Sequence, residues 1–351
     1  MAIAGSGVQH PPAGIAPSSG HGVAWGFSNF GLANLPGGLP AVTAVAAGAE
    51  HSLALESDGT VAAWGDNSAG QSNVPADLRG VIGIAAGGYH SLALKSDGTV
   101  VAWGDDEWGQ ATVPDGLSDV IAIAAGAEHS LALKSDGTVV AWGLNDCGQT
   151  NVPTGLTGVT AIAAGWKDSL ALKSDGTVVA WGGDAYHETD VPPSLNGVTA
   201  IAAGVAHVLA LRSDGTVAAW GDDEGGQTDV PARLNGVIAI SAGVLHSVAL
   251  KSDGSVVAWG YNAEEQATVP PGIVGVTAVS AGYYHNLAIL GGSPRWDVND
   301  DHQVNVLDVA RIGPHWGETG QPGWIPEDVN VDGSIDILDI ALAGSHWGET
   351  P

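Results

Sequence analysis

The sequence predicts an all-β fold, a seven-bladed β-propeller of 39-residue repeats, followed by a small C-terminal α module. Three observations support this prediction. Glycine supplies 53 of the 351 residues, a density that disfavours helices over most of the chain. Phrases such as "HSLALKSDGTVVAWG" recur at a constant period, which is typical of repeat architectures. The period stops after Leu290, where the composition changes and a second module is expected.

Three residue types mark the period, and no insertion breaks their phase between residues 22 and 290. A glycine ends the "AG" word of each unit at Gly48, Gly87, Gly126, Gly165, Gly204, Gly243 and Gly282. A tryptophan stands in each "WG" word at Trp25, Trp64, Trp103, Trp142, Trp181, Trp220 and Trp259. A proline follows at Pro36, Pro75, Pro114, Pro153, Pro192, Pro231 and Pro270. Each period is therefore one structural unit.

Each unit contains three strand patterns and one shorter segment. The words "VTAIAAG" and "HSLALKS" alternate with the two-residue period of a strand, and "TVVAWG" is rich in β-branched residues. The "SDG" between the second and third strands predicts a hairpin turn. Segments such as "QTNVP" are expected to form a fourth, edge strand that proline ends. Antiparallel sheets repeated radially at this size are propeller blades.

The seventh unit, residues 276–290, lacks its third strand. In a complete unit the tryptophan follows the "AG" glycine by 16 residues, so this unit requires a tryptophan at position 298. Subtracting seven periods of 39 gives position 25, which is Trp25. We therefore expect the first strand of the chain to complete the last blade and close the ring, which removes exposed sheet edges. Residues 1–21 are expected to be a disordered N-terminal extension.

Charge and apolar patterning exclude several classes of partner. Ten Lys and Arg against 38 Asp and Glu give a formal net charge of -28, so we expect neither nucleic acid nor an anionic membrane surface as a partner. No apolar run approaches the roughly 20 residues that span a bilayer. The single Cys147 excludes an internal disulfide. The N-terminus shows no clear secretion signal. We expect a monomer.

The words "HSLALKSDGTVVAWG" and "GQTNVP" resemble the regulator of chromosome condensation repeat. The resemblance is greatest to its short-blade bacterial form, of which a secreted β-lactamase inhibitor protein is a member. It covers residues 22–290 and implies a propeller. The eukaryotic members of the family act as guanine-nucleotide exchange factors and bind chromatin, using longer blades and additional loops. This chain lacks those insertions and is acidic, so the resemblance does not imply exchange activity.

Two loops of each unit vary between the copies: the two residues after the "AG" glycine, and the loop after "WG". Both are expected at one face of the propeller, because the strands of a blade run up, down and up. All propeller aromatics outside the repeat tryptophans fall there, namely Phe27, Phe30, Tyr89, Trp108, Trp166, Tyr186, Tyr261, Tyr283 and Tyr284. Beside acidic words such as "DDEWG", they indicate a surface for a protein or carbohydrate partner. The alternative is that tolerant loops vary freely and the aromatics pack across blade joints.

A histidine follows the "AG" glycine by three residues in six units, at His51, His90, His129, His207, His246 and His285. Asp168 takes this position in the fourth unit. A histidine at this position in six of the seven blades suggests either a ring of metal ligands or side chains that cap neighbouring backbone groups, and we favour the structural role. Asp168 is expected to keep the acceptor role and lose the donor. The repeat tryptophans are expected to be wedges in the core.

Residues 291–296 predict a linker into a second module, residues 297–351. The words "DVNDDHQVNVLD" and "DVNVDGSIDILD" begin 31 residues apart. Each places oxygen side chains at positions 1, 3, 5, 9 and 12, the spacing of an EF-hand-type calcium loop, with a backbone ligand at position 7. We predict two calcium ions, held by Asp297, Asn299, Asp301, Gln303, Asn305 and Asp308, and by Asp328, Asn330, Asp332, Ser334, Asp336 and Asp339. The alternative is a solvated acidic tail.

Two such loops, each followed by one helix, resemble a dockerin type I module. The resemblance implies a cohesin-like partner and an association with polysaccharide catabolism. His302 replaces the usual glycine at position 6 of the first loop. The residues at positions 10 and 11, Val306-Leu307 and Ile337-Leu338, are apolar where dockerins present polar residues to a cohesin.

These observations together predict a non-catalytic extracellular or cell-surface interaction protein. Its propeller binds a protein partner through the variable loops, and its calcium module anchors or assembles it. The alternatives are a carbohydrate-binding or polysaccharide-degradation role and, from resemblance alone, β-lactamase inhibition. A glycosidase needs two carboxylates roughly 5 to 9.5 Å apart, and no unit stands out as carrying such a pair. No catalytic residue is predicted.

Overall fold

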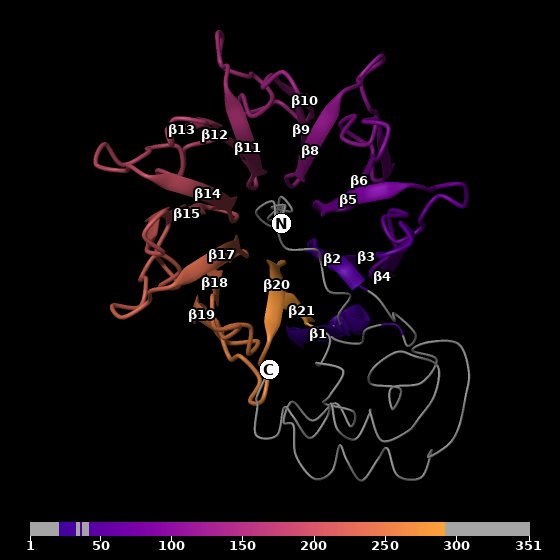
Figure 1. Ribbon diagram of the computed structural model, residues 1–351. Coiled ribbons are helices and arrows are strands. Elements are labelled where there is room, and N and C mark those ends of the chain that lie inside the picture. Colours follow the sequence, from indigo (N-terminus) through magenta and orange to yellow (C-terminus); the bar gives the residue numbers. More distant parts are fainter. Residues whose placement is uncertain (1–20, 33–35, 37–41, 292–351) are drawn as a thin grey trace, which may run out of the picture. The chain divides into compact units, whose positions relative to one another are not determined.

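The computed structural model describes residues 21–32, 36 and 42–291, and these form seven three-stranded antiparallel sheets arranged radially around an axis (Figure 1). The predicted all-β propeller of seven repeats is therefore confirmed. One short 3-10 turn, η1 (Asn29–Gly31), is the one helical element among these residues. We number the blades one to seven, from the sheet that begins with β2 to the sheet that β1 completes.

The strands of each blade follow the order inner, middle and outer. The inner strands are β2 (Val42–Ala47), β5 (Val81–Ala86), β8 (Val120–Ala125), β11 (Val159–Ala164), β14 (Val198–Ala203), β17 (Val237–Ala242) and β20 (Val276–Ala281). The middle strands are β3 (His51–Glu56), β6 (His90–Lys95), β9 (His129–Lys134), β12 (Asp168–Lys173), β15 (His207–Arg212), β18 (His246–Lys251) and β21 (His285–Leu290). The outer strands are β4 (Val61–Gly65), β7 (Val100–Gly104), β10 (Val139–Gly143), β13 (Val178–Gly182), β16 (Val217–Gly221), β19 (Val256–Gly260) and β1 (His21–Gly26).

The N-terminal strand closes the ring as the period predicts. β1 pairs antiparallel with β21, and Trp25 stands opposite Asn286. The first blade has the same register, with Trp64 opposite Ser52. The Trp25 indole also donates to the carbonyl of Gln266 at 3.2 Å, the bond that every other repeat tryptophan makes 32 residues back in the chain. The first strand thus occupies the seventh blade in full register.

The expected fourth, edge strand is absent from the described blades, and the prediction from segments such as "QTNVP" is wrong. Local turns satisfy the backbone there instead: Asn73 N donates to the Gly70 carbonyl at 3.0 Å, and Leu78 N donates to the Pro75 carbonyl at 3.0 Å. The carbonyl of Gln71 accepts from the Trp103 indole and the Ser91 hydroxyl of the next blade. This segment therefore connects two blades and is not free to extend one of them.

Apolar clusters fill the joints between neighbouring blades. In one of them, Leu53 and Leu55 of blade one pack with Ile84 and Trp103 of blade two. The seven repeat tryptophans are all buried, which confirms their predicted role as core wedges. Burial of this apolar surface is the main force that holds the blades together.

Each repeated histidine joins two blades, which confirms the favoured structural role. Its partner is a side chain, so the predicted capping of backbone groups is wrong. His51 Nε2 lies 2.9 Å from Ser91 Oγ of the next blade, and Ser91 in turn donates to the Gln71 carbonyl. A side chain on Gly48 would place its Cβ 2.6 Å from His51 Cε1, which explains the glycine before each histidine. Among the described residues, no three of these histidines bring ring nitrogens within 4.8 Å of one another.

The expectations for residues 1–20, for the linker after Gly291 and for the module 297–351 lie outside the described residues. Within residues 21–32 and 42–291, no helix has the length and apolar character needed to cross a membrane.

Candidate binding face

Both variable loops of every blade lie at one end of the propeller, as predicted. In all seven blades the residue after "WG" donates its backbone N–H to the carbonyl of the second residue after the "AG" glycine. Examples are Asp66 to Glu50 at 2.6 Å and Phe27 to Tyr284 at 2.8 Å. The "WG" glycine makes this approach feasible, because a Cβ on Gly65 would lie 2.5 Å from the Glu50 carbonyl oxygen. We call this end the loop face.

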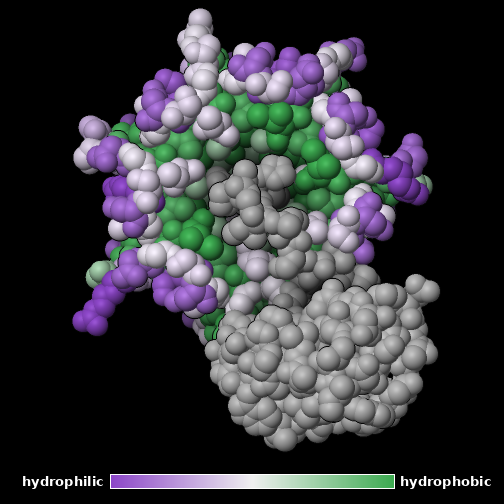
Figure 2. Space-filling model, viewed as in Figure 1, coloured by the Kyte–Doolittle hydropathy of each residue, from purple (hydrophilic) through white to green (hydrophobic). Residues whose placement is uncertain are grey.

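The opposite end carries the "SDG" turns, and we call it the turn face. Inner strands begin there, since Val120 N donates to the carbonyl of Gly98 in the turn of the preceding blade. The second residue of three inner strands, Ile82, Ile121 and Ile238, is exposed close to this end. In Figure 2 hydrophobic residues gather around the centre of the ring and hydrophilic residues around its periphery.

A buried glutamine braces most of the loops after "WG". Gln71 Oε1 accepts from the backbone of Ala69, and its Nε2 donates to Asp66 at 2.9 Å. Gln266 holds its loop in the same way through Oε1. Tyr261 replaces the aspartate of that loop, and the buried Nε2 of Gln266 has no partner among the described residues. In this loop, Tyr261 has therefore replaced the aspartate that would accept a hydrogen bond from the glutamine amide.

Four of the predicted aromatic residues form one contiguous cluster where blades six and seven meet. Tyr284 is at its centre, with ring centroids 4.2 Å from Tyr283, 5.9 Å from Tyr261 and 6.4 Å from Phe27. We call this set the aromatic cluster. Tyr261 is 37% exposed, and the other three are half-buried. The N-terminal strand supplies Phe27, so ring closure and the cluster depend on the same segment.

The other five predicted aromatics lie elsewhere on the loop face. Tyr89 and Trp166 are half-buried and, like Tyr283, pack against the buried Ala49 and Ala127 near the ends of the inner strands. Phe30, Trp108 and Tyr186 are 56%, 49% and 46% exposed. The alternative role of packing across blade joints thus describes the half-buried aromatics in part, whereas it does not describe the exposed ones.

Acidic side chains surround these aromatics. The loops after "WG" expose Asp106, Glu107, Asp184, Asp223, Glu224, Glu264 and Glu265, and they half-bury Asp105 and Asp222. Lys167 is a cation on this face, and its ammonium pairs with the Asp146 carboxylate, which raises the pKa of the lysine. The loop face therefore presents a negative potential to a partner.

Blade four departs from the repeat at several positions that the other blades keep. Asp168 replaces the histidine, Glu188 replaces the glutamine, and Val208 replaces the serine of the following blade. Both oxygens of Asp168 are buried without a partner, so the acceptor role expected from the sequence is wrong. Burial, and then the charge of Glu188, raises the pKa of Asp168 well above its usual range.

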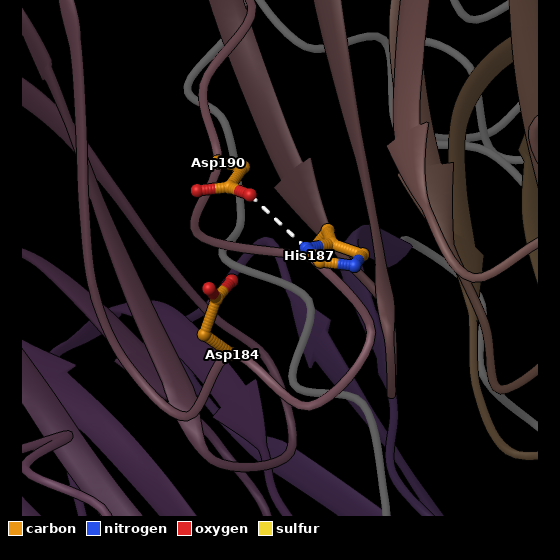
Figure 3. Close-up of side chains that lie close together, drawn as sticks. All are labelled: Asp184, His187 and Asp190. Carbon is orange, nitrogen blue, oxygen red and sulfur yellow. Dashed lines mark hydrogen bonds and ion pairs between the residues drawn. The ribbon is translucent and has the colours of Figure 1, made fainter.

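The loop of blade four also brings Asp184, His187 and Asp190 together, with one side-chain oxygen or nitrogen from each within 4.8 Å of the others (Figure 3). His187 Nδ1 lies 3.1 Å from Asp190 Oδ2. In blade one the residues equivalent to Asp184 and Asp190 are Asn67 and Asn73, which are joined by an amide hydrogen bond of 2.7 Å. Two carboxylates cannot bond in this way, and the imidazole supplies the missing donor. All three residues are exposed, and the cluster braces a loop.

The twelve predicted calcium ligands, from Asp297 to Asp339, lie outside the described residues. No cofactor or metal was predicted for the propeller itself. Sequence comparison of the repeats did not single out Gln266, Glu50 or Glu128 as site residues. The repeat could have identified two of them, because Glu50 and Glu128 belong to the variable pair of residues after the "AG" glycine.

A family model described as the regulator of chromosome condensation (RCC1) repeat matches residues 42–71, 81–110, 120–149, 159–188, 198–227 and 237–266. No curated protein matches the chain. The matched segments run from each inner strand to the bracing glutamine or to its counterpart Glu188.

Several solved structures share the fold. Prp20p from Saccharomyces cerevisiae, characterised for binding to Gsp1p and histones, matches with a TM-score of 0.69 and 20% identity over 80% of this chain and 93% of that one. Yeast RCC1 (Prp20) bound to Kap60 matches with a TM-score of 0.66 and 20% identity over 78% and 90%. The CRINKLY WD40 ectodomain of the Arabidopsis thaliana receptor kinase ACR4 matches with a TM-score of 0.57 and 24% identity over 71% and 93%. At these identities the likeness establishes the fold alone.

Proposed function

Because this chain belongs to the regulator of chromosome condensation (RCC1) repeat family, we propose that its propeller is a non-catalytic module that binds a protein partner through the loop face. The yeast propeller of the same fold binds proteins, namely Gsp1p, histones and Kap60. That precedent supports the class of partner and does not identify it. The same repeat scaffold leaves the loops free to vary, and varied loops on a rigid scaffold commonly carry recognition.

The aromatic cluster is the observation that carries this proposal. Aromatic rings supply large contact areas with few rotatable bonds, and they dominate the energetics of protein interfaces. In this propeller four rings meet in one cluster, formed by Phe27, Tyr261, Tyr283 and Tyr284. The equivalent positions of the other blades mostly hold small, aliphatic or charged residues, and Tyr89 and Trp166 are the aromatic exceptions. Acidic side chains around the cluster fit the polar rim of an interface.

The test compares two variants with the wild type. Phe27→Ser with Tyr261→Ser removes half of the aromatic cluster, and Ile121→Ser with Ile238→Ser removes exposed apolar area from the turn face. Proteins captured from cell extract and culture supernatant are quantified for the three baits, and the same proteins are applied to a glycan array. We expect a set of captured proteins that the loop-face variant loses and the turn-face variant retains. Equal capture by both variants, or a glycan that only the loop-face variant fails to bind, would contradict a protein partner.

We also propose that residues 297–351 bind two calcium ions and act as a calcium-dependent anchor, which suits an extracellular or cell-surface protein. The support is the order of oxygen side chains in the two 12-residue words. Calorimetric titration of the full chain should give two calcium ions per chain, and Asp328→Asn with Asp339→Asn should leave one. Stoichiometry that the substitutions do not change would overturn this assignment. A cohesin-like partner or a polysaccharide is then tested by adding it with calcium or with a chelator.

A further inference from the structure

The first residue after the repeated glycine forms a ring of seven residues around the centre of the loop face. Backbone bonds link the ring between blades: Ala49 N donates to the Gly87 carbonyl at 3.3 Å, and Tyr283 N donates to the Gly48 carbonyl at 3.1 Å. Blades one to three contribute small residues and blades four to seven contribute larger ones. The members in order are Ala49, Gly88, Ala127, Trp166, Val205, Val244 and Tyr283. The ring is therefore uneven, with one arc of small residues.

Aromatic residues border the small arc on both sides. Trp166 follows it on blade four, and Tyr283 precedes it on blade seven. Together with Tyr89 these two rings pack against Ala49 and Ala127, which are buried. All three rings remain partly exposed, so they offer aromatic surface to a partner. We call Tyr89, Trp166 and Tyr283 the central rings.

Two half-buried carboxylates, Glu50 and Glu128, stand directly after the small residues of blades one and three. Within the described part of the chain, neither carboxylate makes a hydrogen bond or an ion pair of its own. Burial is the largest cause that raises the pKa of both groups, and Asp66 raises that of Glu50 further. The charge of Lys167 partly offsets the effect at Glu128. Two carboxylates therefore lose water here without gaining a partner.

Glu50 and Glu128 directly follow Ala49 and Ala127, the two buried alanines against which the central rings pack. Burial raises the pKa of Tyr89, and Glu50, Asp66 and Glu128 raise it further. Burial is also the largest of the causes that raise the pKa of Tyr283 to about 12, and Glu50 is among the others. A positive charge placed against these rings would meet aromatic faces and carboxylates at once, and both attract cations.

Charge complementarity points to the partner side of the interface. Lys167 on the loop face already pairs with Asp146, and Lys95, Lys173 and Lys251 pair with aspartates in the "SDG" turns of the turn face. The chain as a whole has 10 Lys and Arg against 38 Asp and Glu. Because the loop-face lysine Lys167 is already paired, we look for the cation that suits the central rings on another molecule.

We propose that Glu50, Glu128 and the central rings bind an arginine side chain of the partner that the loop face recognises. The proposal rests on the function proposed above and specifies the chemistry of that partner. A guanidinium group is planar, so it stacks on aromatic rings while its N–H fork donates to carboxylates. An ammonium group attracts the same carboxylates but offers neither the flat face nor the fork.

The probes are a short fluorescent Gly-Ser peptide with two arginines, the same peptide with citrulline, and the same peptide with lysine. Fluorescence anisotropy with the full chain should give saturable binding of the arginine peptide. We expect affinity at least about tenfold lower for citrulline, which keeps the shape and loses the charge, and a smaller loss for lysine. A lysine peptide that binds as tightly as the arginine peptide would overturn the assignment to arginine.

Two double variants separate a built site from general negative charge. Glu50→Gln with Glu128→Gln should weaken the arginine peptide about tenfold. Glu107→Gln with Glu224→Gln removes the same charge from exposed positions of the loop face and should change affinity by less than about twofold. An equal loss in both variants, or no saturable binding by the wild type, would overturn the arginine site.

Capture of the protein partner by the two double variants distinguishes a failure of the arginine site from a failure of the loop face as a whole. If Phe27→Ser with Tyr261→Ser loses the captured partner while Glu50→Gln with Glu128→Gln retains it in full, the loop face binds a protein and the arginine site is wrong. If both variants lose the same partner and the arginine peptide binds more tightly than the lysine and citrulline peptides, both proposals are supported.

Discussion

Six of the seven joints between blades share a buried hydrogen bond that the joint between blades four and five lacks. In the regular joint, His129 Nε2 lies 3.0 Å from Ser169 Oγ, and Ser169 donates its single proton to the Gln149 carbonyl at 2.9 Å. The histidine must then be the donor, and its Nδ1 keeps a bare lone pair. In the exceptional joint Asp168 replaces the histidine, and Val208 occupies the position of the serine.

At the joint between blades four and five, both halves of the hydrogen bond differ from the regular joint. Asn286 replaces serine in blade seven, and it still accepts from His246 through Oδ1 and donates to the Gln266 carbonyl through Nδ2. Val208 can do neither, and the histidine that would need it is gone. Asp168 is left 1% exposed with two unpartnered oxygens. The ring therefore tolerates one joint that apolar packing holds without the polar bond.

Acidification should destabilise the propeller more than any single substitution. Burial lowers the pKa of five ring histidines to about 3 and that of His246 to about 4, from an ordinary value of 6.5. The unfolded chain then binds protons first, so stability present above pH 6.5 is lost as the pH falls toward the folded pKa values. Each histidine contributes about 1.4 kcal/mol per pH unit, and six contribute about 8 kcal/mol per unit. We expect thermal unfolding, followed by circular dichroism, to shift steeply downward between pH 6.5 and pH 5.

Asp168 supplies the internal contrast of that experiment. Its raised folded pKa means that the folded state binds the proton first, so its contribution is most favourable below pH 3.8 and declines as the pH rises. Acidification thus weakens six joints and strengthens the joint between blades four and five. A propeller whose melting temperature is the same at pH 7 and pH 5 would show that the histidines are not buried as neutral groups.

Truncation at the two kinds of joint should have opposite signs. His129→Ala leaves Ser169 without its donor and opens a cavity, so the free energy of unfolding should fall by about 3 kcal/mol. Asp168→Ala removes a buried carboxyl group that has no partner, and the free energy of unfolding should rise by about 1 kcal/mol. Denaturant titration at pH 7 measures both. A fall of similar size in both variants would mean that Asp168 has a polar partner in solution.

The repeat predicted most of the fold. The number of in-phase copies gives the number of blades, and the phase of the first strand shows that it completes the last blade. Trp25 could be assigned to blade seven by arithmetic, and the hydrogen bond from its indole to Gln266 follows from the phase. The fourth strand could not be judged in this way. Segments near Gln71 have strand-like composition, but the next blade takes the Gln71 carbonyl, and only the assembled ring reveals that competition.

Prediction of the binding face was less complete. The variable loops and their nine aromatics could be read from the copies, yet which rings touch depends on the neighbouring blade. The contact of Phe27 with Tyr284 joins residues from opposite ends of the propeller sequence. The repeat also contained the signal for the partner of each histidine, because Ser91 follows His51 by one period plus one residue. The pair that begins at position 168 lacks both the histidine and the serine. The calcium loops stay a prediction.

Restoring the hydrogen bond at the joint between blades four and five should change stability by the least, and it tests directly whether the two side chains alone distinguish this joint from the other six. Asp168→His alone places a donor opposite Val208, and Val208→Ser alone places a hydroxyl opposite Asp168, so neither change rebuilds the regular bond. The two together recreate the arrangement of His129 and Ser169. We expect the double variant to exceed the sum of the single effects by about 1 to 2 kcal/mol in the free energy of unfolding.

Denaturant titrations of the wild type, both single variants and the double variant at pH 7.5 give this coupling energy directly. The double variant should also gain a seventh buried histidine, which steepens the loss of stability between pH 6.5 and pH 5 by about 1.4 kcal/mol per pH unit. Additive single effects with an unchanged pH slope would mean that the joint between blades four and five differs in backbone geometry as well as in side chains. Asp168 and Val208 would then be a consequence of that backbone geometry and not its cause.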